Sequence, residues 1–199
     1  MTDMNAITSG IPDEEFIRND KVPGPTKEEI RVVTISKARL HEGCYVVDVG
    51  CGTGSITVES ALKIGRKGKV FSLDDDEEAI QLTRSNVEKF HVNDVVQLVC
   101  GKAPEALLKL PEVDSVIIGG SASLNEVIKA SYRKLKKNGR IVVNAILLET
   151  AVKALDQIKK LGFKELDVAQ IFVAKGQKVS SGTMMLARNP ITIVSATKT

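Results

Sequence analysis

Three glycines at alternate positions follow a short apolar stretch and carry the clearest chemical signal in this chain. Val46–Val49 has the composition of a buried strand, Gly50, Gly52 and Gly54 come after it, and helix-compatible sequence begins at Ser55. Glycine lets a backbone turn sharply with positive φ, and it lets a ligand approach the main chain closely. Because a helix N-terminus also presents free N–H groups, this order of strand, glycine loop and helix predicts a site for a nucleotide-like ligand.

The spacing of the glycines distinguishes between two kinds of nucleotide site. A dinucleotide fingerprint has glycine at the first, third and sixth positions, but the sixth position here is Ser55. Glycine at the first, third and fifth positions, with an acid (Asp48) two residues ahead, resembles the S-adenosylmethionine loop of Rossmann-like methyltransferases. The implied cofactor is therefore S-adenosylmethionine. The loop residues expected to bind it are Gly50, Cys51, Gly52, Thr53 and Gly54.

Asp74, at the expected end of the second strand, is the next candidate cofactor contact. It stands 20 residues after Gly54, and in dinucleotide folds an acid after the second strand accepts hydrogen bonds from the ribose. The competing interpretation is an N-cap for the helix that begins near Glu77. We favour the ribose role, because Asp75 or Asp76 could cap that helix instead.

Two further loops are expected at the same edge of the sheet. Cys100–Pro104 follows the third strand and is placed to pass the adenine of the cofactor, with the backbone amide near Ala103 as a donor. Lys102 stands where methyltransferases often have an acid, and an ammonium cannot accept a hydrogen bond from the adenine amino group. The loop after the fourth strand contains Gly120 and Ser121. It is either a tight turn or a place where a ligand lies against the backbone.

Strand-like and helix-like segments alternate up to Gly162, and this alternation must position the loops. Strands that alternate with helices predict right-handed βαβ crossovers and a parallel sheet covered on both faces. A capping box, Thr26 with Glu29, predicts a further helix that runs to about Leu40. The expected strands are 44–49, 69–73, 95–100, 115–119 and 140–145, and the other expected helices are 53–64, 77–90, 104–108, 123–135 and 148–161.

After Gly162 the pattern changes to strands alone. Segments 164–173, 183–188 and 191–195 are strand-like, with only a Gly- and Ser-bearing loop between the first two. They predict an antiparallel hairpin that closes one edge of the sheet. The expected fold class is α/β, a Rossmann-like methyltransferase fold with a mostly parallel seven-stranded sheet and an antiparallel C-terminal hairpin. We expect one domain over residues 1–199, with a loose tail at 1–12.

Composition and charge limit the function classes. Only 4% of the 199 residues are aromatic and the net charge is +3, so stacking platforms for nucleic acid are scarce and no nucleic-acid partner is expected. No apolar run approaches the roughly 18 residues of a membrane helix, so no membrane association is expected. Cys44, Cys51 and Cys100 have neither an even count nor metal-type spacing. This predicts reduced thiols, no metal site and a cytoplasmic location.

Several short segments, taken together, narrow the resemblance to one family. They are IPDEEFI (11–17), VPGPTKEEIR (22–31), DVGCGTG (48–54), APEAL (103–107), GGS (119–121), AILLET (145–150) and GTMMLARNP (182–190). In this combination, over roughly residues 11–195, the chain closely resembles the archaeal-type cobalt-precorrin-6B C15-methyltransferases (decarboxylating) of the anaerobic cobalamin pathway.

The resemblance implies an activity, an assembly and a set of contacts. The reaction would be methylation of a tetrapyrrole, cobalt-precorrin-6B, at C15 with loss of carbon dioxide from an acetate arm, giving cobalt-precorrin-7. The protein would be a homotetramer. Arg31, Lys27 and Arg188 are candidate partners for the many carboxylates of this substrate, and no catalyst of decarboxylation is identified. The implied cofactor contacts are Thr26 (which would also cap its helix), the Gly50–Gly54 loop, Asp74 and Ala103, and the candidate substrate contacts are Gly120, Ser121 and Arg188.

Other interpretations of the same loop stay open. An RNA methyltransferase, for example one that acts on tRNA adenine, would usually bring an RNA-binding module or a pronounced basic face, and neither is evident in this sequence. A non-catalytic nucleotide-binding subunit could keep the loop without a substrate pocket, and fold alone does not exclude it. Glu149 is either an acid/base or a helix cap, and we favour the cap.

Overall fold

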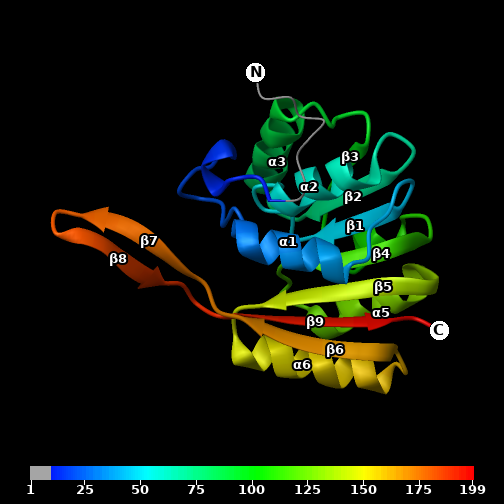
Figure 1. Ribbon diagram of the computed structural model, residues 1–199. Coiled ribbons are helices and arrows are strands. Elements are labelled where there is room, and N and C mark those ends of the chain that lie inside the picture. The colour runs from blue at the N-terminus through cyan, green and yellow to red at the C-terminus, as the bar shows by residue number, and fades with distance from the viewer. Residues whose placement is uncertain (1–9) are drawn as a thin grey trace.

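A mostly parallel sheet forms the centre of the molecule, of which the computed structural model describes residues 10–199 (Figure 1). Its strands are β1 (Tyr45–Val49), β2 (Lys69–Asp74), β3 (Val96–Cys100), β4 (Val113–Ile118), β5 (Leu135–Ala145), β6 (Lys164–Ile171) and β9 (Ile191–Thr197). Their order in space is β3-β2-β1-β4-β5-β9-β6. β1 to β5 run parallel, and β9 is antiparallel to both β5 and β6. The expected seven-stranded, mostly parallel sheet is confirmed.

Helices cover both faces of this sheet and divide the core into two layers. α1 (Glu28–Lys37), α2 (Ser55–Ile64) and α3 (Glu77–Lys89) pack on one face, and α4 (Glu105–Leu108), α5 (Leu124–Lys134) and α6 (Leu148–Lys160) pack on the other. The division follows from the two-residue period of a strand. Val46 of β1 belongs to the layer under α1–α3, and its neighbour Val47 belongs to the layer under α4–α6.

The elements expected between residues 44 and 161 are all present, with ends that differ by a few residues. The largest difference is β5, which begins at Leu135 and so includes residues 136–139, between the expected helix 123–135 and the expected strand 140–145. Across residues 10–199, no helix is both long enough and apolar enough to cross a bilayer.

α1 begins at Glu28 and is capped from a distant part of the chain. Its N-cap position is Lys27, which makes no capping bond through its side chain. Instead, the Glu28 N–H donates to Asp13 Oδ1 at 2.9 Å, from the one-turn 3-10 helix η2 (Asp13–Glu15). The predicted capping role of Thr26 is therefore wrong, because a tertiary contact satisfies this helix end.

The segment that precedes η2 is held against the body of the protein. Ile11 is only 3% exposed, and its N–H donates to Glu59 Oε1 in α2 at 3.1 Å. The Gly10 N–H donates to Glu59 Oε2 at 3.3 Å. Of the loose tail expected over residues 1–12, residues 1–9 lie outside the described residues, and the rest is packed.

The chain between β6 and β9 forms a separate ribbon. β7 (Ala174–Val179) and β8 (Gly182–Ala187) pair antiparallel and project away from the sheet (Figure 1). β6 and β9 do close the sheet edge, but the predicted strand 183–188 pairs with β7 instead of joining that sheet. The sequence predicts a loop where β7 stands, since its Gly, Lys and Gln residues have low strand propensity.

Candidate active site

A cavity of about 1190 Å³ opens at the carboxyl ends of the parallel strands. From β1 the sheet continues to β2 and β3 on one side and to β4 and β5 on the other, and ligands of open α/β sheets bind where strand order reverses in this way. The volume exceeds the roughly 300–1,000 Å³ of a typical small-molecule site, so a cofactor and a second molecule have room. The sequence-predicted residues that line it are Thr26, Gly50, Cys51, Gly52, Thr53, Asp74, Ala103, Gly120, Ser121 and Arg188.

Neighbouring loops lie so close to the glycine loop that two of its positions have no room for a side chain. A Cβ on Gly50, whose φ is +75°, would come within 2.6 Å of the Gly120 carbonyl oxygen. A Cβ on Gly52, whose φ is +54°, would meet the Pro23 carbonyl oxygen at 2.9 Å. The absence of a Cβ at these two positions therefore lets the glycine loop approach the segments at Pro23 and Gly120 closely. Gly54 packs against α3 and does not line the cavity.

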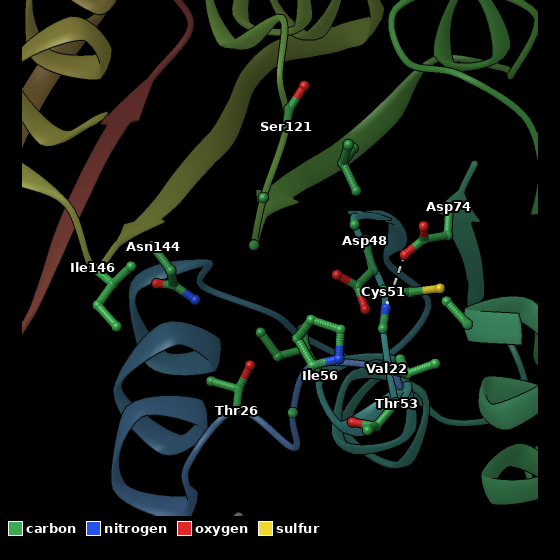
Figure 2. Close-up of a pocket in the computed structure, with 18 of the residues that line it drawn as sticks. Val22, Thr26, Asp48, Cys51, Thr53, Ile56, Asp74, Ser121, Asn144 and Ile146 are labelled. Atoms are coloured by element: carbon green, nitrogen blue, oxygen red, sulfur yellow. Dashed lines mark hydrogen bonds between the residues drawn. The ribbon is translucent and has the colours of Figure 1, made fainter. Parts of the chain in front are cut away.

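Asp74, at the end of β2, has the remaining acceptor capacity that a ribose diol requires. Its Oδ2 accepts from the Gly52 N–H at 3.0 Å (Figure 2), and its Oδ1 accepts from the Asp76 N–H at 3.1 Å. A carboxylate offers about four lone-pair sites, so each oxygen can accept one more hydrogen bond. The competing role as cap of α3 belongs to Asp76, whose carboxylate accepts from the Glu78 N–H at 2.9 Å.

Asp48 lines the cavity with an acidic group that is almost fully buried. It is 1% exposed and accepts a hydrogen bond from Thr57 Oγ1 at 2.6 Å. Burial raises the pKa of Asp48 to about 6, with a further contribution from the negative charge of Asp74, although the Thr57 hydrogen bond opposes the shift. The site therefore contains a carboxyl group that keeps its proton to a higher pH than an exposed aspartate does.

Cys51 is buried beside this acid and is not activated. Burial raises the pKa of its thiol to about 12, and the charge of Asp48 adds to the effect. Thr83 Oγ1 lies 3.3 Å from its sulfur. The thiol stays protonated at neutral pH, so its contribution to the site is shape and not nucleophilicity.

The loop after β3 lines the side of the cavity predicted to hold adenine. Ala103 lies in this wall, and its carbonyl oxygen accepts from Ser123 Oγ at 3.2 Å, which links the loop to the start of α5. Lys102 lines the same wall, with an exposed side chain. Gly120 has open space where a Cβ would stand. This half of the cavity fits S-adenosylmethionine. The glycine loop offers exposed backbone, Asp74 has free acceptor sites, and the wall consists mostly of small residues.

The structure separates the three basic residues predicted to hold substrate carboxylates. Lys27 and Arg188 line the cavity and share Asp13 Oδ2, at 3.4 and 3.3 Å. Arg31 is fully buried and pairs with Asp13 Oδ1 at 2.8 Å and with Glu59 Oε1 at 2.7 Å. The prediction for Arg31 is wrong, because its guanidinium is fully buried between carboxylates of the protein and does not line the cavity.

Comparison with known proteins places this geometry in a family. Residues 16–198 match the model of the precorrin methyltransferase domain. The chain belongs to this family. It is 53% identical over 190 residues to a probable cobalt-precorrin-6B C(15)-methyltransferase (decarboxylating) of Sulfurisphaera tokodaii, and the match covers 95% of this chain and 97% of that relative.

Solved structures of precorrin enzymes share the fold. A precorrin 8W decarboxylase of Methanobacterium thermoautotrophicum is 41% identical with a TM-score of 0.89, covering 94% of this chain and 98% of that one. A precorrin-6y C5,15-methyltransferase of Geobacter metallireducens is 38% identical with a TM-score of 0.86, covering 96% and 97%. The expected Rossmann-like methyltransferase fold is confirmed.

Sequence reasoning missed the half of the precorrin methyltransferase cavity that lies beyond β4. Figure 2 shows Asn144, near the end of β5, and Ile146, just after it, across the cavity from Asp48 and Asp74. Val173, Ile191 and Ile30 also line the cavity. One signal was available: Asn144 interrupts an apolar run at the carboxyl end of a parallel strand, which is where α/β sheets place ligand contacts.

Glu149 has neither of the roles that the sequence suggested. It is exposed in the first turn of α6, whose N-cap is Leu147 without a side-chain capping bond. It does not line the cavity. The predicted cap is wrong, because the helix starts one residue before Glu149.

Proposed function

We propose that this precorrin methyltransferase methylates cobalt-precorrin-6B at C15 and removes carbon dioxide from an acetate arm, giving cobalt-precorrin-7. The observation that carries the proposal is the cavity of about 1190 Å³, which joins a cofactor-type loop to a second half with apolar and basic side chains. Identity of 53% along nearly the whole chain to a relative named for this reaction supports the choice of substrate. The same comparison supports the anaerobic cobalamin pathway as its setting.

We propose that the cofactor half of the cavity binds S-adenosylmethionine. Gly50, Gly52 and Thr53 would hold its methionine part, Asp74 its ribose hydroxyls, and the loop at Ala103 its adenine. Thr26 would complete the contact from the opposite wall. When bound, S-adenosylmethionine supplies an electrophilic methyl group on a positively charged sulfur.

The residues of the second half would bind and align the macrocycle. Ile30, Ile146 and Ile191 offer apolar surface to the ring. Lys27 and Arg188, at 3.3–3.4 Å from Asp13, offer positive charge to peripheral carboxylates. If the ring is held so that C15 faces the methyl group, the reaction between two bound molecules becomes effectively unimolecular, which lowers its barrier. The Gly120–Ser121 loop lies between the two halves and is the proposed neighbour of the reacting carbon.

We further propose that the chain works as a single domain in a cytoplasmic homotetramer. The exposed apolar residues Met184, Met185 and Leu186 on β8 support an assembly role for the ribbon. Free thiols at Cys44, Cys51 and Cys100 suit a reducing compartment.

The test is a single-turnover assay with cobalt-precorrin-6B and S-adenosylmethionine carrying a labelled methyl group. We expect a tetrapyrrole product that is one methyl group heavier and one carbon dioxide lighter. Asp74→Ala should weaken binding of S-adenosylhomocysteine by about 1–3 kcal/mol in calorimetry, because a charged acceptor is lost.

Three results would contradict the proposal or a part of it. Label that enters tRNA, with no labelled tetrapyrrole, would assign the chain to RNA methylation. Tetrapyrrole that binds without change would assign it a non-catalytic role. Equal affinity of Asp74→Ala and wild type for S-adenosylhomocysteine would remove Asp74 from the cofactor site.

A further inference from the structure

Lys27 and Arg188 reach the cavity from parts of the chain that are far apart in sequence. Lys27 stands just before α1, and Arg188 follows β8 at the base of the ribbon. Both line the cavity, and both are partly exposed. Long basic side chains lose much rotational freedom when a ligand fixes them, so a site gains affinity if the protein holds them in place beforehand.

The carboxylate of Asp13 brings these two cations together. Its Oδ2 lies 3.4 Å from Lys27 Nζ and 3.3 Å from Arg188 Nη1. Within residues 10–199, Asp13 is the only acid in ion-pair contact with either cation. Because both nitrogens lie beside the same oxygen, they are close enough to each other to bind the two oxygens of one further carboxylate.

The other oxygen of Asp13 is fixed by α1. Asp13 Oδ1 accepts from Arg31 Nη1 at 2.8 Å and from the Glu28 N–H at 2.9 Å. Asp13 is only 7% exposed, and it does not itself line the cavity. It is therefore a buried support for the two cations and not a ligand contact of its own.

The charges of this cluster leave one cation in excess. Arg31 pairs with Glu59 at 2.7 Å as well as with Asp13. Three cations thus share two carboxylates in the part of the chain that the structure describes. An ammonium has three N–H donors and a guanidinium has five, so Lys27 and Arg188 keep donors for a ligand. One carboxylate from a ligand would balance the cluster.

We propose that Asp13 is a positioning residue, which holds Lys27 and Arg188 as a pair that binds one peripheral carboxylate of the tetrapyrrole between them. The inference rests on the proposed function and adds the residue through which the two cations act together. Arg31 acts one step further back, because it orients the carboxylate of Asp13.

The negative charge of Asp13 has an opposing effect, since by itself it would repel a substrate carboxylate. The cluster as a whole nevertheless stays positive. We therefore expect the gain from holding two cations in place to exceed this repulsion. Removal of the charge of Asp13 decides between the two effects.

The first test combines Asp13→Asn with loss of the two cations. Asp13→Asn keeps an acceptor for Arg31 but removes the charge that attracts Lys27 and Arg188. We expect it to raise KM for cobalt-precorrin-6B about tenfold with a smaller change in kcat, because the same contact is made before and during the reaction. In a protein that already carries Lys27→Met and Arg188→Met, it should change KM by less than about twofold, because the residues through which it acts are absent.

Two controls accompany this cycle. The affinity for S-adenosylhomocysteine should stay within about twofold in every variant, because the cluster lies outside the proposed cofactor contacts. Asp20→Asn changes an exposed acid of the same N-terminal segment and should behave as wild type.

The second test requires no change at Asp13. It compares Lys27→Met, Arg188→Met and the protein with both substitutions. If both cations bind one carboxylate, KM of the double variant should rise by much less than the product of the two single effects. Lys109→Met, at an exposed position after α4, is the matched control.

Four results would overturn the inference. Unchanged KM or tighter substrate binding in Asp13→Asn would show that Asp13 does not position the pair. A further rise in KM without both cations, or a parallel loss of S-adenosylhomocysteine affinity, would make its role structural. Multiplying effects of Lys27→Met and Arg188→Met would assign the two cations to separate carboxylates. A wild-type protein that binds S-adenosylhomocysteine but does not methylate the tetrapyrrole would overturn the proposed function itself, and the inference with it.

Discussion

The buried carboxyl group of Asp48 makes the stability of the fold depend on pH. Its carboxyl is enclosed by the sheet and α2, and Thr57 is its hydrogen-bond donor. Its pKa of about 6 in the folded chain lies above the value of about 3.9 for an exposed aspartate. Between these values the unfolded chain has released a proton that the folded chain keeps. The free energy of unfolding therefore falls as pH rises through this window, and the loss is complete above about pH 6.

Asp48→Asn should remove this loss, because the amide keeps the shape and the acceptor for Thr57 without the charge. At pH 8 we expect the variant to be more stable than wild type by up to about 3 kcal/mol, and we expect the difference to shrink toward pH 4. Urea unfolding at both pH values measures it. Asp156→Asn on the exposed side of α6 is the control and should show no such trend. A variant that is less stable than wild type at pH 8 would contradict the prediction.

The positive charge of the proposed cofactor offers a functional reason for a buried acid at Asp48, although burying that acid lowers the stability of the fold. The deprotonated form of Asp48 places a negative charge in a cavity proposed to bind a positively charged sulfonium. Residues in locally destabilising environments, such as a buried acid, are often found at functional sites. The neighbouring Cys51, whose raised pKa keeps it neutral, adds no competing charge.

At the scale of elements, Arg31 joins three segments that surround the site. Its guanidinium donates to the carboxylates of Asp13 and Glu59, and to the carbonyl oxygens of Ile11 and Thr26. Burial alone would raise the pKa of Asp13, but the hydrogen bond and charge of Arg31, aided by Lys27 and Arg188, lower it below its usual value. The start of α1, and with it the cavity wall at Thr26, depends on this cluster.

Arg31→Met should therefore be strongly destabilising. It would leave the buried Glu59 carboxylate without a cation and Asp13 with only Lys27 and Arg188, and breaking a buried pair in this way typically costs about 3–5 kcal/mol. Chemical denaturation at pH 7 measures the loss. Lys129→Met is the control, because it breaks only the exposed pair with Glu126 and should cost less than about 1 kcal/mol. Similar losses in both variants would contradict the structural role of Arg31.

Ion pairs tie the ribbon to the start of α1 and to η2. Lys175 of β7 pairs with Glu29 at 2.8 Å and with Glu28 at 3.5 Å, both at the start of α1. At the same end of the ribbon, Arg188 follows β8 and pairs with Asp13. The base of the ribbon is thus tied to the same helix start as the cavity wall.

At the scale of the whole molecule, the ribbon leaves apolar surface uncovered. Met185 is 62% exposed in β8, beside the exposed Met184 and Leu186, and exposed apolar patches of this kind often mark an interface. We expect Met185→Glu to lower the oligomeric state in sedimentation velocity, because the charge would be buried between subunits. Affinity for S-adenosylhomocysteine should not change.

Lys129→Glu, on the exposed side of α5, is the control for this change of charge. It should leave the assembly as it is in the wild type. A Met185→Glu protein with unchanged oligomeric state would remove this part of the ribbon from the proposed interface.

The sequence by itself determined the features that depend on neighbours along the chain. Apolar runs and helical periods set the alternation of strands and helices, and the glycines after Val49 set the loop. Asp74 and Ala103 could be expected beside that loop, because the carboxyl ends of parallel strands share one edge. The order of these elements limits the topology to a few arrangements, so the fold could be inferred as well.

Only the tertiary structure decided which distant groups meet. Asp13, and not Thr26, accepts the hydrogen bond at the start of α1. The guanidinium of Arg31 pairs with Glu59 instead of a substrate carboxylate. β8 pairs with β7 instead of extending the sheet. Local periodicity specifies which face of an element is buried, whereas the partner of a buried charge or donor depends on segments far away in sequence that pack against it.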